Sequence, residues 1–113
     1  MNTSSSKLDS TQIGIIVLTV ATAAIHFFVA YIFPSMRTLF ILNGLGYLAL
    51  LAAYFLPQLR NARNLVRWAL IAFTAVTIVG YFVVNGVKMD PLGLITKLIE
   101  VVLIFLLWKD GRK

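Results

Sequence analysis

The sequence has no cysteine, four acidic residues and one histidine. Without cysteine, disulfides, thiolate chemistry and cysteine-ligated metals are all excluded. The lone histidine, His26, leaves no multi-histidine metal site within a single chain. Charged residues of both signs make up only 12% of the chain, whereas an ordinary soluble domain carries roughly 25%. The chain therefore lacks the polar surface that keeps a folded domain in water.

Long apolar stretches take the place of that polar surface. The chain is 60% hydrophobic, with a mean hydropathy of +0.92. No charged residue occurs from Ile13 to Phe33, and about 20 apolar helical residues are enough to cover the bilayer core. The small residues at 21–23 resemble a signal-peptide cleavage site, but the apolar run continues beyond them, which favours a retained span. The sequence therefore predicts an integral membrane protein.

Prolines, glycines and polar residues divide the chain into four predicted spans. These run from about residue 12 to 33, 37 to 56, 64 to 84 and 91 to 108. The pair Asp90-Pro91 supplies a cap acceptor and a first-turn proline for the fourth span. Connections of roughly four to eight residues make sequential helices antiparallel neighbours. This pattern predicts an all-α, up-down-up-down four-helix bundle.

We expect a single transmembrane domain with a short tail on either side. The predicted boundaries are a disordered cytoplasmic tail at residues 1–11, the four-helix domain at residues 12–108 and a basic cytoplasmic tail at residues 109–113.

Basic residues indicate how the helices are oriented. One end of the predicted bundle carries most of them: Lys7, Arg60, Arg63, Arg67, Lys109, Arg112 and Lys113. The opposite end carries Arg37 and Lys88. By the positive-inside rule, we expect a multi-pass protein of the cell membrane with both termini cytoplasmic. The net charge of +6 is thus placed at helix ends, and no basic folded surface indicates nucleic-acid binding.

Three of these arginines have helical spacing. Arg60, Arg63 and Arg67 lie three and four residues apart, so we expect them to share one helical face and to be candidates for binding anionic lipid headgroups. Simple anchoring of the topology is the more common role of such residues. Trp68 and Trp108 fall at the same end, as in an interfacial aromatic belt.

Seven polar side chains fall in the spans at similar depth. Counted at ~1.5 Å per residue, all of them lie within about 15 Å of the outer membrane face. They are His26, Asn43, Tyr47, Thr77, Tyr81, Lys97 and Glu100. Each helix presents its polar and small residues on a single face, and polar groups in lipid need partners inside the protein. We therefore expect these faces to meet and treat the seven residues as candidates for ligand or proton handling.

Lys97 and Glu100 differ in what they can reach. Lys97, about 9 Å deep, has a flexible side chain that is expected to extend to the outer headgroups. Glu100, about 13 Å deep, is shorter and needs a partner, a proton or a hydrated cavity. Pairing with Lys97 is one alternative, although Lys before Glu is the less favourable order in a helix. His26 is the best interhelical partner, because the first and fourth helices are neighbours in a closed bundle.

Structural and functional roles both stay open for these residues. Lys97 and Glu100 are either an ion pair that sets helix register, a group that handles a proton, ion or ligand, or a contact to another subunit. His26 is a hydrogen-bonded packing residue, a titrating group or an axial ligand to haem or a chlorin. For Asn43 and the threonines, interhelical hydrogen bonding is the default interpretation. The small residues of segment 43–53 (NGLGYLALLAA) favour close helix packing.

Two resemblances accompany these features. The length and the four spans are similar to those of the small multidrug-resistance transporters, a family with one essential membrane glutamate. That family carries its glutamate in the first span, whereas this chain has Glu100 in the fourth, so the resemblance covers architecture alone. A late histidine in the first span, LNGLGYL opening the second and a charged pair in the fourth resemble uncharacterised small four-span proteins of bacteria and archaea. That second resemblance implies no activity.

The sequence therefore favours a small non-catalytic membrane protein, either an accessory or scaffold subunit or a self-associating bundle. Its expected partners are the lipid bilayer and a membrane protein or a second copy of the chain, and no cofactor or metal is expected. The alternative is a proton- or ion-coupled transport module, or a module that binds a quinone-like ligand, using His26 and Glu100. An enzyme is not expected, since the spacing supports neither repeated metal ligands nor a nucleophile-base pair.

Overall fold

A computed structural model describes residues 8–85 and 91–112, and this part of the chain is all helical. Four α-helices follow one another: α1 (Ser10–Ile32), α2 (Arg37–Phe55), α3 (Arg63–Asn85) and α4 (Pro91–Asp110). Two short 3-10 helices, η2 (Pro34–Met36) and η3 (Pro57–Ala62), connect the first three. The predicted all-α class and its four helices are confirmed for the described residues.

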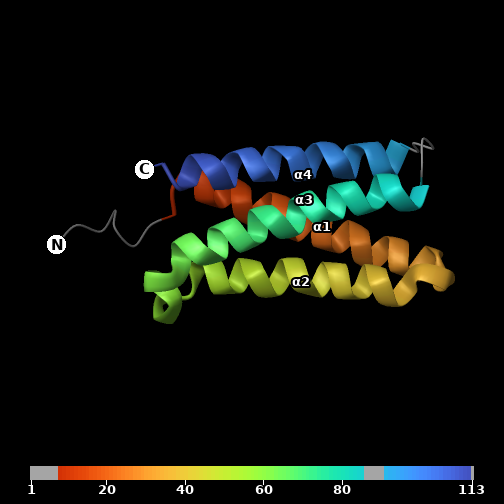
Figure 1. The fold of residues 1–113 in the computed structure, drawn as a ribbon, viewed down its shortest axis with the longest axis horizontal. Helices are drawn as coiled ribbons and strands as arrows, with labels where there is room; N and C mark the ends of the chain where they lie inside the picture. Colours follow the sequence, from red (N-terminus) through yellow and green to blue (C-terminus); the bar gives the residue numbers. More distant parts are fainter. Residues whose placement is uncertain (1–7, 86–90, 113) are drawn as a thin grey trace.

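The four helices lie side by side and alternate in direction, with both termini at the same end of the molecule (Figure 1). α1 packs on α2 and α4, and α3 packs on the same two helices, so the four form a closed ring. We call the end that carries the termini the terminal end. The other end, where η2 connects α1 to α2, is the distal end.

A capping box makes α1 begin earlier than predicted. Asp9 Oδ1 accepts a hydrogen bond from the backbone N of Gln12 at 2.9 Å, and Gln12 Oε1 accepts one from the backbone N of Asp9 at 3.4 Å. Two N–H groups that a helix start leaves free are thereby satisfied. Residues 10 and 11 therefore belong to the helix, which corrects the predicted tail boundary. α4 likewise continues through Asp110, whereas the predicted cap Asp90 lies outside the described residues.

Arginines at the starts of α2 and α3 bind the ends of the preceding helices. Arg37 donates from Nε to the backbone O of Ala30 at 2.9 Å and from Nη2 to the backbone O of Tyr31 at 3.2 Å. Arg63 donates from Nε to the backbone O of Tyr54 at 2.9 Å. Carbonyls in the last turn of a helix have no partner within that helix. Each arginine therefore stabilises one helix end together with the turn that follows it.

Two glycines of α2 let the neighbouring helices come close. A Cβ on Gly44 would lie 2.7 Å from the ring of Phe27 in α1, and a Cβ on Gly46 would lie 2.5 Å from the ring of Phe73 in α3. The Phe73 ring also packs edge-on against Tyr47, with ring centres 4.9 Å apart. This part of segment 43–53 accommodates aromatic rings from both flanking helices, in agreement with the packing interpretation of its small residues.

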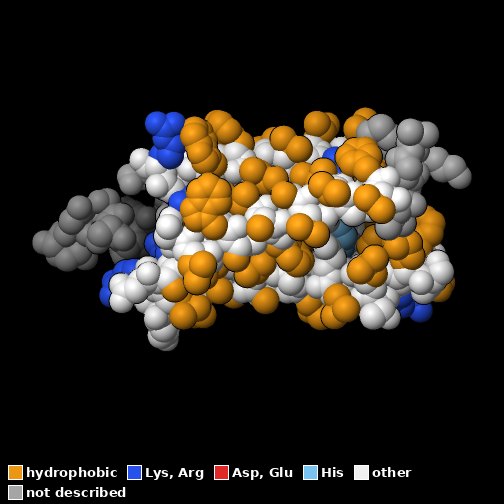
Figure 2. Space-filling view, viewed as in Figure 1, with side chains coloured by type: hydrophobic (Ala, Val, Ile, Leu, Met, Phe, Trp, Pro, Cys, Tyr) orange, Lys and Arg blue, Asp and Glu red, His pale blue; other side chains and the backbone are white. Residues whose placement is uncertain are grey.

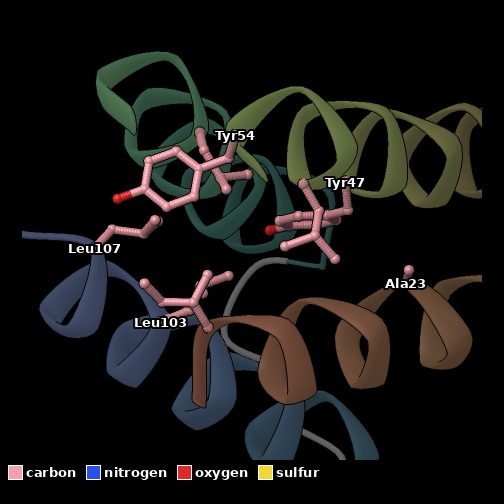
Figure 3. Packing of buried hydrophobic residues seen from close by; sticks show 8 residues of the cluster. Ala23, Tyr47, Tyr54, Leu103 and Leu107 are labelled. Atoms are coloured by element: carbon pink, nitrogen blue, oxygen red, sulfur yellow. The ribbon is translucent and has the colours of Figure 1, made fainter. Parts of the chain in front are cut away.

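The interior is small and partly polar. Thr19, Thr22, Thr74 and Glu100 are fully buried. Between the helices, a hydrophobic cluster fills the rest of the core (Figure 3). Its buried members are Ile15, Ala23, Tyr47, Leu51, Tyr54, Leu70, Leu103 and Leu107.

Large hydrophobic side chains cover the outer surface instead. Tyr31 is 79% exposed and Leu65 is 73% exposed, and hydrophobic side chains extend along the body of the molecule in Figure 2. Lysine and arginine side chains gather mainly at the terminal end in the same view. Polar groups inside and apolar groups outside are the arrangement expected of a protein whose solvent is lipid.

Among the described residues, three helical segments are long and apolar enough to cross a membrane. They are Ser10–Ile32, Pro34–Phe55 and Pro57–Val83. The 23 residues of α1 span about 34 Å at ~1.5 Å per residue, slightly more than the ~30 Å thickness of a bilayer core. These three helices are compatible with the predicted membrane localisation.

Candidate functional site

Glu100 lies at the centre of a network that joins three helices. Its Oε2 accepts hydrogen bonds from the hydroxyl of Tyr47 in α2 at 2.8 Å and from Thr22 Oγ1 in α1 at 3.1 Å. Its Oε1 forms an ion pair with Lys97, one turn earlier in α4. A carboxylate removed from solvent needs a counter-charge and hydrogen bonds. The fully buried Glu100 has both.

Lys97 turns inward, so the prediction that it extends to the outer surface is wrong. The residue is 6% exposed and pairs with Glu100. Its Nζ also lies 5.0 Å from the centre of the Tyr81 ring in α3, a favourable position for a cation over an aromatic face. The order of Lys before Glu is the weaker one on an exposed helix. Inside the protein, however, a buried carboxylate without a counter-charge costs more free energy than the less favourable order of the pair.

His26 lies beside the Glu100 network and is bonded to its own helix. Its Nδ1 is 2.7 Å from the backbone O of Thr22, one turn earlier in α1. The centre of its ring lies 5.8 Å from that of Tyr47 and 6.2 Å from that of Phe40. The prediction of His26 as the main interhelical partner of Glu100 is therefore wrong. The interhelical partners of Glu100 are instead the hydroxyls of Tyr47 and Thr22.

Asn43 and Thr77 form a second pair, next to the Glu100 network, that joins α2 to α3. Asn43 Nδ2 donates to Thr77 Oγ1 at 2.8 Å, and Thr77 Oγ1 donates to the backbone O of Phe73 at 2.9 Å. Both bonds fit the interhelical role expected for these residue types. The seven candidates are thus divided. Five of them lie in or against the Glu100 network, and two form this second link.

Two adjacent cavities lie in the distal half, next to the network. One has a volume of about 160 Å³ and the other a volume of about 240 Å³. Five residues line both of them: His26, Met36, Phe40, Tyr81 and Lys97. Together the cavities form what we call the distal chamber. It brings side chains of all four helices and η2 around a largely apolar space.

At the terminal end, the three arginines do not share one helical face as predicted. Pro57 opens the 3-10 segment η3, in which Leu59 leaves the helical region with φ −104° and ψ 17°. Arg60 is exposed within this segment, whereas α3 begins only at Arg63. The regular spacing of three and four residues therefore does not correspond to one continuous α-helix.

Arg67 is also less available to a lipid headgroup than predicted. It is 7% exposed, donates to Asn64 Oδ1 and lies 4.8 Å from the centre of the Trp68 ring. Arg112 lies over Trp108 in the same way, at 4.7 Å. The two tryptophans expected at this end thus each carry an arginine on one ring face.

Two interactions involve residues outside the predicted site. The first is the bond from Thr22 to Glu100. Thr22 lies on the polar face of α1 one turn before His26, so its spacing indicated a buried position, but a threonine in an apolar helix is too common to be singled out as a site residue.

The second is at the terminal end, where Tyr54 donates to Asp110 Oδ2 and joins the end of α2 to the end of α4. Asp110 had been assigned to the tail, so the sequence offered no reason to pair them.

Within residues 8–85 and 91–112, the structure is all helical, has three segments long and apolar enough to cross a membrane, and encloses the ion pair of Lys97 and Glu100. The chain belongs to the family of unknown function DUF7475, whose model matches residues 1–108. No curated protein and no solved structure matches it. The function must therefore be inferred from the residues themselves.

Proposed function

We propose that this chain is a small non-catalytic integral membrane protein, serving as an accessory or scaffold subunit or as a self-associating bundle. Its helices are held in register by the Glu100 network. The observation that carries this proposal is that Glu100 is fully buried while both of its oxygens are occupied by residues of the same chain. Charges inside a membrane are costly, and this arrangement removes that cost by internal pairing.

In this proposal all four helices cross the cell membrane and both termini are cytoplasmic. α4 has 20 residues, which matches the length needed to span, and it packs between α1 and α3. The basic residues of the terminal end support a cytoplasmic location for that end. The Glu100 network then lies in the outer half of the bilayer.

A transport role for Glu100 receives less support from the same geometry. A carboxylate that carries a proton or ion across a membrane has to exchange partners and to reach water on each side. Glu100 has no exposed surface, and Tyr47, Thr22 and Lys97 all bind it at once. These contacts favour a structural link over a mobile carrier.

The proposal is tested by comparing wild type, Glu100→Gln and His26→Ala in mild detergent and in liposomes. We expect Glu100→Gln to lower the thermal unfolding midpoint, because the partners of the carboxylate are left incompletely satisfied. We also expect wild-type liposomes to leak protons no faster than empty ones. A proton flux in wild type that is lost in a stably folded Glu100→Gln variant would contradict the structural role.

A second candidate function is the binding of a small ring-bearing molecule such as a quinone head in the distal chamber. The observation that favours it is His26, which is only 7% exposed and lines both cavities. Glu100 is not among the described residues that line either cavity. The charged or titratable side chains that line both cavities are His26, Lys97 and Tyr81, while Ser35 and Thr96 add polar groups to the first cavity and Asn43 and Thr77 add polar groups to the second. In this candidate function the ligand would therefore bind to His26 and Lys97, and not to the predicted pair of His26 and Glu100.

A further inference from the structure

The hydrogen-bond state of His26 determines which group a ligand in the distal chamber must carry. A backbone carbonyl only accepts hydrogen bonds, so the contact with the Thr22 carbonyl requires a hydrogen on His26 Nδ1. In a neutral imidazole the other nitrogen, Nε2, is then an acceptor. Among the described residues, no hydrogen bond to Nε2 is found. A buried histidine therefore presents an unused acceptor beside a cavity.

Lys97 supplies the complementary donor in the same chamber. Its ammonium has three N–H donors, of which the ion pair with Glu100 occupies one side and the Tyr81 ring another. The residue lines both cavities together with His26. A ligand between them meets an acceptor and a donor. A hydroxyl satisfies both, whereas a carbonyl or an ionised carboxylate can only accept.

The walls and the size of the chamber favour a ring. Phe33, Phe40 and Tyr81 contribute to the first cavity, and Phe40, Phe73 and Tyr81 contribute to the second. Aromatic faces and edges favour contact with another ring. The cavity volumes of about 160 and about 240 Å³ are comparable to an apolar cavity of ~150 Å³ that accommodates benzene. The chamber therefore suits a ligand with one aromatic ring in contact with the polar groups.

From these three observations we propose that the distal chamber binds a phenol-class ligand, a hydroxylated aromatic ring whose hydroxyl donates to His26 Nε2 and accepts from Lys97. This inference rests on the binding module described as the second candidate function. It narrows the ligand from a quinone-like ring in general to a ring in its hydroxyl-bearing form. A quinone, which has carbonyls in place of hydroxyls, leaves the His26 acceptor unsatisfied.

The test uses the full chain in detergent micelles and fluorine NMR with two probes, 4-fluorophenol and 4-fluoroanisole. The ether has the same ring and an acceptor oxygen but no donor. We expect saturable binding of 4-fluorophenol and about tenfold weaker binding of 4-fluoroanisole, a difference of about 1.4 kcal/mol, because the ether leaves the buried acceptor without a donor. His26→Leu should weaken 4-fluorophenol to the level of the ether.

A second variant keeps the test independent of His26. Gly80 lines the larger cavity, and a Cβ added there meets no atom within 4 Å, so the backbone accepts a side chain. Gly80→Leu should fill that space and abolish binding of both probes, while Gly80→Ala should retain 4-fluorophenol binding. Circular dichroism and the unfolding midpoint verify that each variant is folded.

The outcomes separate the ligand class from the binding function. Equal affinity for the two probes, with both blocked by Gly80→Leu, would overturn the phenol class and leave a ring-binding chamber. Binding of the aliphatic 5-fluoropentanol as tightly as 4-fluorophenol would overturn the requirement for a ring. Absence of saturable binding for every probe would overturn both the ligand class and the binding module, without affecting the structural role of Glu100.

Discussion

The hydroxyl of Tyr47 donates a 2.8 Å hydrogen bond to Oε2 of Glu100, 53 residues further along the chain. The two residues lie on α2 and α4, which face each other across the ring of helices and are not packing neighbours. The bond therefore crosses the centre of the molecule. Thr22 of α1 reaches the same oxygen, so one carboxylate ties three of the four helices together.

The crossing bond predicts a measurable loss in Tyr47→Phe. Phenylalanine retains the packing against Phe73 but removes the donor, so we expect the free energy of unfolding to fall by about 1 to 2 kcal/mol. The matched control is Tyr31→Phe, because Tyr31 is 79% exposed. If the two substitutions change the free energy of unfolding in detergent equally, the buried hydroxyl of Tyr47 contributes no stability, and the prediction is contradicted.

Two glycine-to-alanine substitutions should have opposite effects. A Cβ at Gly46 would lie 2.5 Å from the Phe73 ring, whereas a Cβ at Gly80 meets nothing within 4 Å. Gly46→Ala has to displace that ring and the Tyr47 contact behind it, and we expect a loss of about 1 to 3 kcal/mol. Gly80→Ala should be neutral or stabilising by up to ~1 kcal/mol, the usual gain in a helix. Thermal unfolding of the two variants provides the comparison, and a destabilised Gly80→Ala would contradict the open space at that position.

Arg63 and Arg60 provide another matched pair. Arg63 donates to the backbone carbonyl of Tyr54 and lies 5.7 Å from the centre of its ring, whereas Arg60 is exposed in η3. Arg63→Ala should lower stability by about 1 to 2 kcal/mol, since a carbonyl at the end of α2 loses its charged donor. Arg60→Ala should leave it unchanged within about 0.5 kcal/mol. Unfolding midpoints measured in one detergent would decide the prediction, and equal losses would remove the proposed capping role.

The sequence predicted the existence of the helices and their polar faces, because both depend on local spacing. Long apolar runs between prolines predict spans, and a threonine or histidine at every third or fourth position predicts a common face. Thr22 and His26 accordingly lie on the buried side of α1. The helix starts were less predictable, since the one at Asp9 depends on a side-chain bond to Gln12 that extends the helix beyond its apolar stretch.

The pairing of residues across faces could not be predicted from spacing. A lysine in a span can extend to the surface or pair within the protein, and the choice depends on whether a carboxylate nearby has enough other partners. For Lys97 it depends on Glu100, whose hydrogen bonds come from two other helices. His26 was expected to bind Glu100 because of its depth, but its Nδ1 instead bonds to the backbone carbonyl of Thr22, one turn earlier in α1. The prediction of one shared arginine face at the terminal end was wrong for a local reason, since Arg60 lies in the 3-10 segment η3 and α3 begins only at Arg63.

The most direct measurement of the central claim is a double-mutant cycle on Lys97 and Glu100, using unfolding free energies in mixed detergent micelles. Lys97→Met leaves Glu100 without its counter-charge and should cost roughly 3 kcal/mol or more. Glu100→Gln leaves a buried lysine unpaired. The double variant removes both charges, so its loss should be smaller than the sum by roughly 2 kcal/mol. Losses that simply add would show that the two charges do not stabilise each other, and the account of Glu100 as the internally paired centre of the fold would be contradicted.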